Sequence, residues 1–208
     1  MAPASENRQP VLVHLRRNSM SVERTLQAPS VKSPDSTDQP HSRTAQIHLD
    51  APRMDEGPSL WNLARESREL DVNSPYFYAL WCRDFAASSV VVRSAEGIHG
   101  FTLAFARPGD PETLFVWQTA VAAAHQGQGL ARRMVDHLAG HRFRFVEATV
   151  TPDNTASDRF LSAFARARGA TLERTPLFGE ELFPVGHAPE ELLRIGPLNS
   201  PQPASPDQ

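Results

Sequence analysis

The sequence predicts a mixed α/β fold built around a strand, a glycine-bearing loop and a helix. Residues 114–121 are apolar on both alternating faces except at Gln118 and Thr119, as in a strand covered on both sides. Two glycines follow within residues 126–131, and apolar residues then recur at helical spacing through residues 130–138. The glycines therefore lie where a central strand turns into a helix.

Composition limits the size and class of the protein. At 208 residues with 40% hydrophobic content, the chain can bury one good core. A net charge of −3 argues against electrostatic binding to nucleic acid. The single cysteine, Cys82, excludes an intrachain disulfide, and no Cys/His cluster has zinc-ligand spacing. Because no apolar run has the length of a membrane span or a signal peptide, we expect a cytoplasmic protein.

The two ends of the chain differ in composition from its centre. Residues 1–44 are rich in Ser, Pro, Gln and charge, which predicts a disordered leader. A mitochondrial transit peptide is the alternative, because arginines such as Arg8 and Arg16 are present, but acids such as Glu6 and Glu23 argue against it. Residues 198–208 predict a flexible tail. One domain is therefore expected over residues 45–197.

The first half of this domain reads as a strand, two helices and a hairpin. A strand is expected at 46–49 and a helix at 59–70. Ser74 as N-cap and Pro75 as first helical residue predict a second helix, ending near residue 85, in which Cys82 is a small buried hydrophobe. Runs at 88–93 and 98–105, joined by residues 95–97, predict a hairpin.

The second half alternates strands and helices around the glycine loop. A turn at 108–111 precedes the central strand, and another strand is expected at 142–150. Pro152, Asp153 and Asn154 start a helix that ends at Gly169. Strands at 170–174 and 192–195 complete the order β-α-α-β-β-β-α-β-α-β-β.

The glycine loop has the properties of a diphosphate cradle. The first amides of a helix have no intrahelical partner, and glycines let a ligand approach the backbone. No Lys-Ser/Thr follows the second glycine, and the three-glycine dinucleotide spacing is absent, so neither of those phosphate motifs applies. A glycine turn that merely ends a strand is the alternative.

The pattern Gln-x-x-Gly-x-Ala resembles the acetyl-CoA motif of the GCN5-related N-acetyltransferases, and the order of elements is also similar over about residues 46–197. This resemblance implies a GCN5-related N-acetyltransferase fold, with a mostly antiparallel sheet of about seven strands flanked by four helices and splayed at the central strand. It implies acetyl-CoA as co-substrate and no metal. The residues implied to bind the coenzyme are Val121, Ala123, Gln126, Gly127, Gln128, Gly129, Leu130, Ala131, Asn154 and Ser157.

Three further stretches resemble the branch of that family that acetylates L-2,4-diaminobutyrate, a step of ectoine biosynthesis. They are residues 70–74 (Leu-Asp-Val-Asn-Ser), 114–118 (Leu-Phe-Val-Trp-Gln) and 149–154 (Thr-Val-Thr-Pro-Asp-Asn). This resemblance implies direct attack of the 4-amino group on the thioester, giving N4-acetyl-L-2,4-diaminobutyrate. The product leads to a compatible solute made under osmotic stress, and relatives commonly form homodimers. No nucleic-acid or membrane partner is expected.

The same resemblance implies the substrate contacts. Asp71 is expected to bind an ammonium group, although a turn residue ahead of Ser74 is an equally good reading of its spacing. Tyr76 and Trp117 are carried over as pocket walls, where large aromatic residues are otherwise more often core. His187 is carried over as a substrate contact or proton relay.

The general base and the acid depart from the pattern of related enzymes. Those enzymes have a glutamate just before the matching histidine, where this chain has Val185 and Gly186. Glu147, on the strand beside the cleft, is the substitute base to test, and an exposed strand acid is the alternative. Phe160 stands where many acetyltransferases have a tyrosine that protonates the leaving thiolate. Two other functions stay open: acetylation of a different small amine, and a non-catalytic acyl-CoA-binding sensor.

Overall fold

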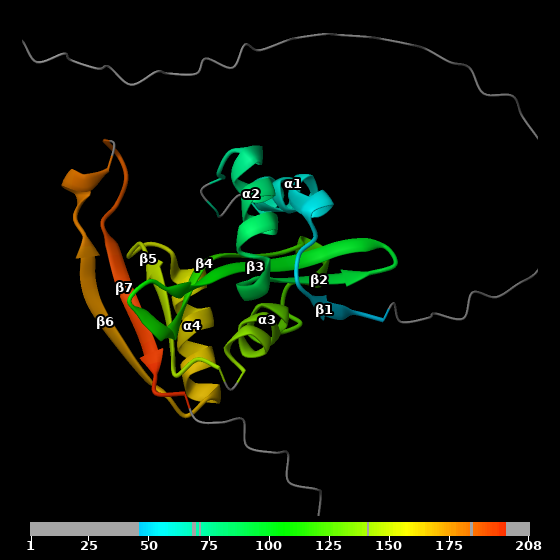
Figure 1. Ribbon diagram of the computed structural model, residues 1–208. Helices are drawn as coiled ribbons and strands as arrows, with labels where there is room; N and C mark the ends of the chain where they lie inside the picture. Colours follow the sequence, from blue (N-terminus) through cyan, green and yellow to red (C-terminus); the bar gives the residue numbers. More distant parts are fainter. Residues whose placement is uncertain (1–45, 68–69, 71, 141, 184, 199–208) are drawn as a thin grey trace, which may run out of the picture. The chain divides into compact units, whose positions relative to one another are not determined.

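The computed structural model describes residues 46–67, 70, 72–140, 142–183 and 185–198. They form a seven-stranded sheet and four α-helices, in the order that the sequence predicts (Figure 1). The predicted leader, residues 1–44, and the predicted tail beyond Leu198 lie outside the described residues.

The elements match the predicted ones with small shifts at their ends. None of the helices in the described ranges is long and apolar enough to cross a membrane. The strands are β1 (His48–Asp50), β2 (Val90–Ser94), β3 (Gly97–Arg107), β4 (Asp110–Val121), β5 (Phe145–Val150), β6 (Thr171–Phe178) and β7 (Glu190–Gly196). The helices are α1 (Gly57–Ser67), α2 (Pro75–Asp84), α3 (Leu130–Ala139) and α4 (Thr155–Ala167).

The sheet has the strand order β1-β2-β3-β4-β5-β7-β6, so the last strand in sequence lies between β5 and β6. All neighbours are antiparallel except β4 and β5, which are parallel. The β4–β5 pair has only three registered positions, the last of which joins Phe115 to Glu147. Beyond it β4 continues to Val121 and β5 to Val150 without pairing to each other. The predicted splay at the central strand is therefore confirmed.

Helices cover both faces of the sheet (Figure 1). On one face, α1 and α2 bury Leu60 and Tyr78 against Phe101 of β3. On the other face, α3 and α4 bury Val135 and Phe164 together with residues of β4, β5 and β7. Each amphipathic helix thus buries its apolar side on the sheet, and the opening between β4 and β5 lies between the two layers.

Helix α2 begins as the sequence predicts. Its N-cap Ser74 accepts a hydrogen bond from the Phe77 amide at 3.4 Å, and Pro75 is the first helical residue. Cys82 on the same helix is 2% exposed, and burial raises the pKa of its thiol to about 11. Cys82 is therefore the inert core residue that was expected.

Candidate active site

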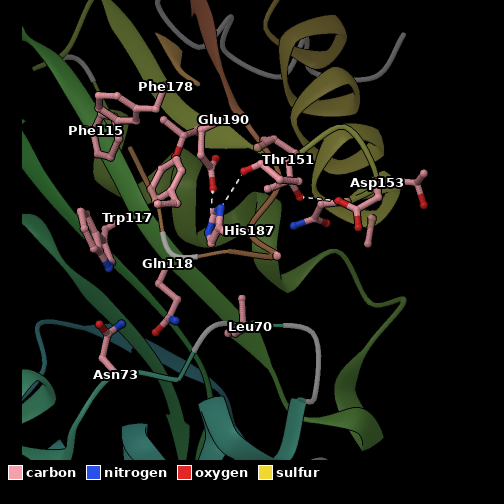
Figure 2. A pocket seen from close by; sticks show the side chains of 18 residues that line it. Leu70, Asn73, Phe115, Trp117, Gln118, Thr151, Asp153, Phe178, His187 and Glu190 are labelled. Carbon is pink, nitrogen blue, oxygen red and sulfur yellow. Dashed lines mark hydrogen bonds and ion pairs between the residues drawn. The ribbon is translucent and has the colours of Figure 1, made fainter. Parts of the chain in front are cut away.

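A cavity of about 780 Å³ opens where β4 and β5 stop pairing. Its walls come from the two diverging strands, the α1–α2 connection, the β5–α4 turn and the β6–β7 connection. Figure 2 shows Trp117, Gln118, His187 and Glu190 facing this space. Side chains from five separate parts of the chain therefore meet at the splayed end of the central strand.

Trp117 owes its position to an irregularity in β4. Val116 pairs with Ala104 and Gln118 with Leu103, so Trp117 is an extra residue without a cross-strand partner on β3. Its side chain is 49% exposed and lines the cavity, while Phe77 and Trp81 of α2 support the ring with centroids 6.1 Å and 5.7 Å away. An aromatic face held in this way can pack against an alkyl chain or an ammonium group.

Gln118 is held in place from below the cavity. The Tyr78 hydroxyl donates a hydrogen bond to the Gln118 side-chain oxygen at 2.9 Å, in the buried layer between α2 and β4. Burial raises the pKa of Tyr78, which keeps the phenol protonated as the donor. The orientation of the Gln118 amide is thereby fixed before any substrate enters.

His187 lies on the β6–β7 connection and has a defined tautomer. Its Nδ1 atom is 2.6 Å from the carbonyl oxygen of Ala188. A carbonyl only accepts, so Nδ1 carries the hydrogen, and Nε2 of the neutral ring is the basic nitrogen. The ring also stacks on Phe183, with centroids 4.1 Å apart and planes inclined by 22°. The imidazole is therefore oriented by a carbonyl on one side and an aromatic face on another.

Two carboxylates line the cavity. Glu190, at the start of β7, has an oxygen 4.0 Å from Nε2 of His187, and its side chain is 17% exposed. Asp153, in the turn before α4, accepts a hydrogen bond from Thr151 at 2.6 Å, and this bond lowers the pKa of Asp153. The cavity thus presents anionic groups that suit a cationic amine. The sequence analysis singled out neither residue for the substrate, although Glu190 stands three residues after His187, which was a usable signal.

The predicted coenzyme loop forms the expected strand-to-helix turn. After β4 come a short 3-10 helix (Ala123–His125) and two glycines in left-handed conformation, Gly127 at φ 75° and Gly129 at φ 72°. Gly129 is the residue from which α3 starts. A Cβ atom at either glycine would meet nothing within 4 Å. Glycine is therefore favoured at both positions by the left-handed backbone conformation, since no neighbouring atom would collide with a side chain there.

The loop is open to a ligand. Gln126, Gly127, Gln128 and Gly129 are exposed, whereas Leu130 turns into the core and Ala131 is half-buried. The Gln126 and Gln128 side chains donate to the carbonyls of Val121 and Ala124, each at 3.3 Å, and so brace the loop. A second cavity of about 270 Å³ lies beside it, lined by Val121, Ala123 and Gln126 among others. The exposed residues just ahead of α3 leave the positive end of this helix open to an anion.

The remaining coenzyme residues lie at the start of α4. Asn154 caps this helix by accepting a hydrogen bond from the Ser157 amide at 3.1 Å. Asn154 also lines the large cavity, and Ser157 is not among its lining residues. Asn154 is therefore the N-cap of α4 and also forms part of the cavity wall.

The other predicted substrate residues are Asp71 and Tyr76. Asp71 lies outside the described residues. Tyr76 is 72% exposed on α2 and is not among the residues lining the cavity, because its position on the helix turns away from the layer that holds Phe77 and Tyr78. Of the carried-over substrate contacts in the described residues, Trp117 and His187 are the two that face the cavity.

Glu147 is buried in an ion-pair network. It is 1% exposed, and Arg107 donates to both of its oxygens at 3.2 Å and 3.1 Å. Arg194 of β7 donates to it as well and also pairs with Asp110 at 3.4 Å. These guanidinium groups occupy the oxygens that a base would use, and Glu147 is not among the residues lining the cavity. The network ties β4, β5 and β7 together next to the last β4–β5 pair.

Within the described residues no group of three or more His, Cys, Asp or Glu side chains is arranged to hold a metal ion. The cavity itself offers an oriented imidazole, carboxylates and aromatic walls.

The profile of the Acetyltransferase (GNAT) family matches residues 57–165, which include the splayed strands, the glycine loop and most of α4. An L-2,4-diaminobutyric acid acetyltransferase of Streptomyces coelicolor is 50% identical over 163 residues, or 75% of this chain and 96% of that protein. Another, from Streptomyces anulatus, is 47% identical over 164 residues, or 76% and 93% of the two chains.

A solved structure is similar as well. The diaminobutyrate acetyltransferase EctA from Paenibacillus lautus, in complex with its substrate L-2,4-diaminobutyric acid and coenzyme A, superposes with a TM-score of 0.69. It is 39% identical, and the match covers 74% of this chain and 96% of that chain. The chain therefore belongs to the acetyltransferase (GNAT) family and, within it, to the L-2,4-diaminobutyric acid acetyltransferases, as an acyltransferase whose acetyl donor is acetyl-CoA.

Proposed function

We propose that this protein transfers acetyl from acetyl-CoA to the 4-amino group of L-2,4-diaminobutyrate, giving N4-acetyl-L-2,4-diaminobutyrate, a step of ectoine biosynthesis. The observation that carries the proposal is the cavity between β4 and β5, where Trp117, His187 and Glu190 face one space. The relative from P. lautus, whose solved complex contains that amine and coenzyme A, supports the choice of substrate.

His187 and Glu190 form the proton-accepting side of the site. A primary amine has a pKa of about 10, so it arrives as an ammonium and must lose a proton before its lone pair can attack the thioester. Nε2 of His187 is the acceptor, because Nδ1 is held by the Ala188 carbonyl. Glu190 attracts the incoming ammonium and then stabilises the imidazolium that forms. We prefer this pair to Glu147, whose oxygens are held by two arginines.

The open edge of β4 supplies the acyl side. The Ala122 amide donates to the His99 carbonyl at 2.8 Å, next to the registered pair Gly100–Val121, so Val121 stands at a non-hydrogen-bonded position of the antiparallel ladder. The neighbouring Val121 amide then points away from β3, toward the side from which β5 has diverged. Val121 is therefore the backbone donor for the oxyanion that develops as the amine attacks.

The glycine loop holds the other end of the donor. In this proposal the first amides of α3, from Leu130 onward, bind the diphosphate of acetyl-CoA at the positive end of the helix. Asn154 at the cavity wall contacts the pantetheine arm, with Ser157 one turn further along α4. Phe160 is half-buried against the core and cannot donate a proton, so the thiolate leaves without a side-chain acid at this position. The second proton of the attacking amine is lost to solvent, and solvent protonates the thiolate.

One assay tests the assignment. Purified protein is incubated with acetyl-CoA and L-2,4-diaminobutyrate, free thiol is followed over time, and the acetylated nitrogen is located by NMR. Thiol release with acetylation at N4, and much lower kcat/KM for polyamines and aminoglycosides, is the expected result. No turnover of diaminobutyrate would remove the assignment, and bound acetyl-CoA without turnover of any amine would point to an acyl-CoA sensor.

A cytoplasmic homodimer is the assembly that goes with this proposal. Leu177 and Leu182 are 40% and 63% exposed on and just after β6, which is an edge strand of the sheet. Apolar side chains at an exposed edge favour contact with a second copy of the chain. Light scattering on the purified protein should give twice the mass of one chain, and a monomer at micromolar concentration would contradict the dimer.

A further inference from the structure

Two histidines stack where the coenzyme loop leaves the sheet. The rings of His99, on β3, and His125, at the end of the short 3-10 helix of the loop, have centroids 4.1 Å apart and planes inclined by 33°. Neither histidine is among the residues lining the two cavities described above. The stack lies behind the loop, on the side that faces β3.

The same two residues are joined through the backbone. The His99 carbonyl accepts the Ala122 amide at 2.8 Å, and the His125 amide donates to the Ala122 carbonyl, also at 2.8 Å. Ala122 therefore connects the two histidines through the backbone, and their side chains are in contact through the stacked rings. These contacts attach the 3-10 helix at the start of the loop to β3. They therefore determine the position of the following glycines and of the start of α3.

The surroundings favour an uncharged stack. His99 is 7% exposed, and burial followed by the neighbouring His125 lowers its pKa, against a smaller opposite effect of Glu96. Its Nε2 lies 2.6 Å from the Ser94 hydroxyl. His125 has a buried Nδ1 atom for which the described residues offer no hydrogen-bond partner.

Acidic residues lie on two of the elements around the stack. On β2, Arg93 is held by Asp50 and Glu56, and Ser94 is uncharged. On α1, Glu66 lines the second cavity together with Ala122, Ala123 and Gln126, the residues on either side of His125. The charge of Glu96, in the β2–β3 turn, raises the pKa of His99, a smaller effect than those of burial and of His125. Burial and the nearby His125 ring therefore outweigh Glu96 and favour an uncharged His99.

We propose that the His99–His125 stack is a positioning element of the coenzyme site, which in its neutral form holds the loop in the conformation that binds acetyl-CoA and which lets the loop shift when it is protonated. This inference rests on the proposed binding of the coenzyme diphosphate at residues 126–131. It makes His99 and His125 determinants of coenzyme affinity that act through the loop backbone. The affinity for the amine substrate does not depend on them directly.

Calorimetric titration with coenzyme A tests the inference without any turnover. Binding is measured at about pH 8 and about pH 5.5, on either side of the usual histidine pKa. Dephospho-coenzyme A is used in parallel, because it lacks the monoester phosphate that itself titrates near about pH 6. The variants are the double substitution His99→Phe with His125→Phe, which keeps two stacked rings but no titrating group, and His48→Gln on exposed β1 as control.

In the unmodified protein and in His48→Gln, the Kd for both ligands should rise by about tenfold on acidification. This factor corresponds to a difference of about one pKa unit between the free and the ligand-bound protein. In the double variant the Kd for dephospho-coenzyme A should be the same at both pH values. Equal affinities of the unmodified protein at both pH values would overturn the proposal. Tighter binding on acidification that the double variant loses would also overturn it, since His125 would then be a cationic contact of the diphosphate.

Two further measurements keep the outcomes separate. Circular dichroism verifies that the double variant is folded. If the double variant does not fold, the single variant His125→Phe is used instead, because His125 is half-exposed. With this single variant the acidification effect should shrink, and an undiminished effect would count against the proposal. Diaminobutyrate turnover at about pH 8 is measured in parallel. Absence of that turnover removes the proposed function, whereas pH-independent coenzyme binding with normal turnover removes only the inference on the histidines.

Discussion

Nε2 of His187 lies 4.0 Å from the carboxylate of Glu190, while Nδ1 of the same ring is 2.6 Å from the Ala188 carbonyl. The two residues stand three positions apart, where the β6–β7 connection enters β7 (Figure 2). This relationship gives the imidazole a fixed tautomer and puts a carboxylate beside Nε2, the nitrogen that we propose as the proton acceptor. It also means that the pair and the aromatic wall Trp117 belong to different segments of the chain.

Replacing His187 by Gln should remove the proton acceptor. We expect kcat to fall by about 10²-fold or more, the usual contribution of a general base, with little change in the KM for acetyl-CoA. Glu190→Gln should lower kcat and raise the KM of the amine. Steady-state kinetics with each substrate varied in turn checks both. Glu191→Gln, which disturbs only the Arg174 pair next door, is the matched control; an equal loss of kcat in this variant would contradict the assignment.

Replacing Gly129 by Ala should separate backbone strain from coenzyme binding. A non-glycine residue at φ 72° costs about 1–2 kcal/mol, and a shifted loop would bind the diphosphate less well. The KM for acetyl-CoA should rise several-fold, and the KM for diaminobutyrate should not. Gly109→Ala, at φ 81° in the β3–β4 turn, carries similar strain far along the sequence from the loop. If both variants raise the KM for acetyl-CoA equally, the loop is not the coenzyme site.

Replacing Glu147 by Gln should act on stability. The side chain is buried with two arginines, and removal of one partner of such a network costs about 3 kcal/mol. Urea unfolding of Glu147→Gln should show this loss. Glu112→Gln, whose pair with Arg144 is exposed on both sides, should stay within about 1 kcal/mol of the unmodified protein. A large loss of kcat at unchanged unfolding free energy would instead identify Glu147 as the base.

Trp117→Ala should weaken amine binding. An aromatic face beside an ammonium contributes about 1–2 kcal/mol when partly desolvated, which corresponds to roughly a tenfold rise in the KM of diaminobutyrate. Trp117→Phe keeps an aromatic face and should recover most of the affinity. Equal effects of the two substitutions, or an effect on acetyl-CoA alone, would show that the ring does not contact the amine.

The buried thiol of Cys82 gives a prediction on pH. Its pKa is about 11 in the folded protein, against 9.0 for a free thiol, so the protonated form is favoured by folding. The stabilising contribution is complete below about pH 9 and is lost as the pH rises toward about 11, where both states ionise. A chromogenic disulfide reagent should therefore find no reactive thiol at about pH 8 until urea unfolds the protein. Rapid reaction of the folded protein would contradict this burial.

Local signals predicted the elements well because they act within a few residues. Ser74 and Pro75 fix the start of α2, and the two glycines of the loop fix the start of α3. The ends shifted where a turn competes: β5 begins at Phe145 because the amides of Arg142 and Phe143 still bond back to the Ala139 carbonyl.

The parts that could not be predicted depend on contacts between distant segments. The place of β7 between β5 and β6 is a matter of sheet order, which no local pattern states. The sequence predicts Glu147 as the substitute base, with an exposed strand acid as the alternative, because nothing local shows that Arg107 and Arg194 come to it from β3 and β7. The sequence predicts the last strand only from residue 192, which leaves Glu190 in the connection before it. In the structure β7 begins at Glu190, and this residue lines the cavity.

The network around Glu147 also bears on how the enzyme behaves at high ionic strength. At about 1 M salt the Debye length is about 3 Å, which screens surface pairs such as Arg144 with Glu112. Glu147 itself is out of reach of counterions, so its bonds to Arg107 and Arg194 are screened far less. The spacing of β4 and β5 at the mouth of the cavity is therefore maintained in concentrated electrolyte.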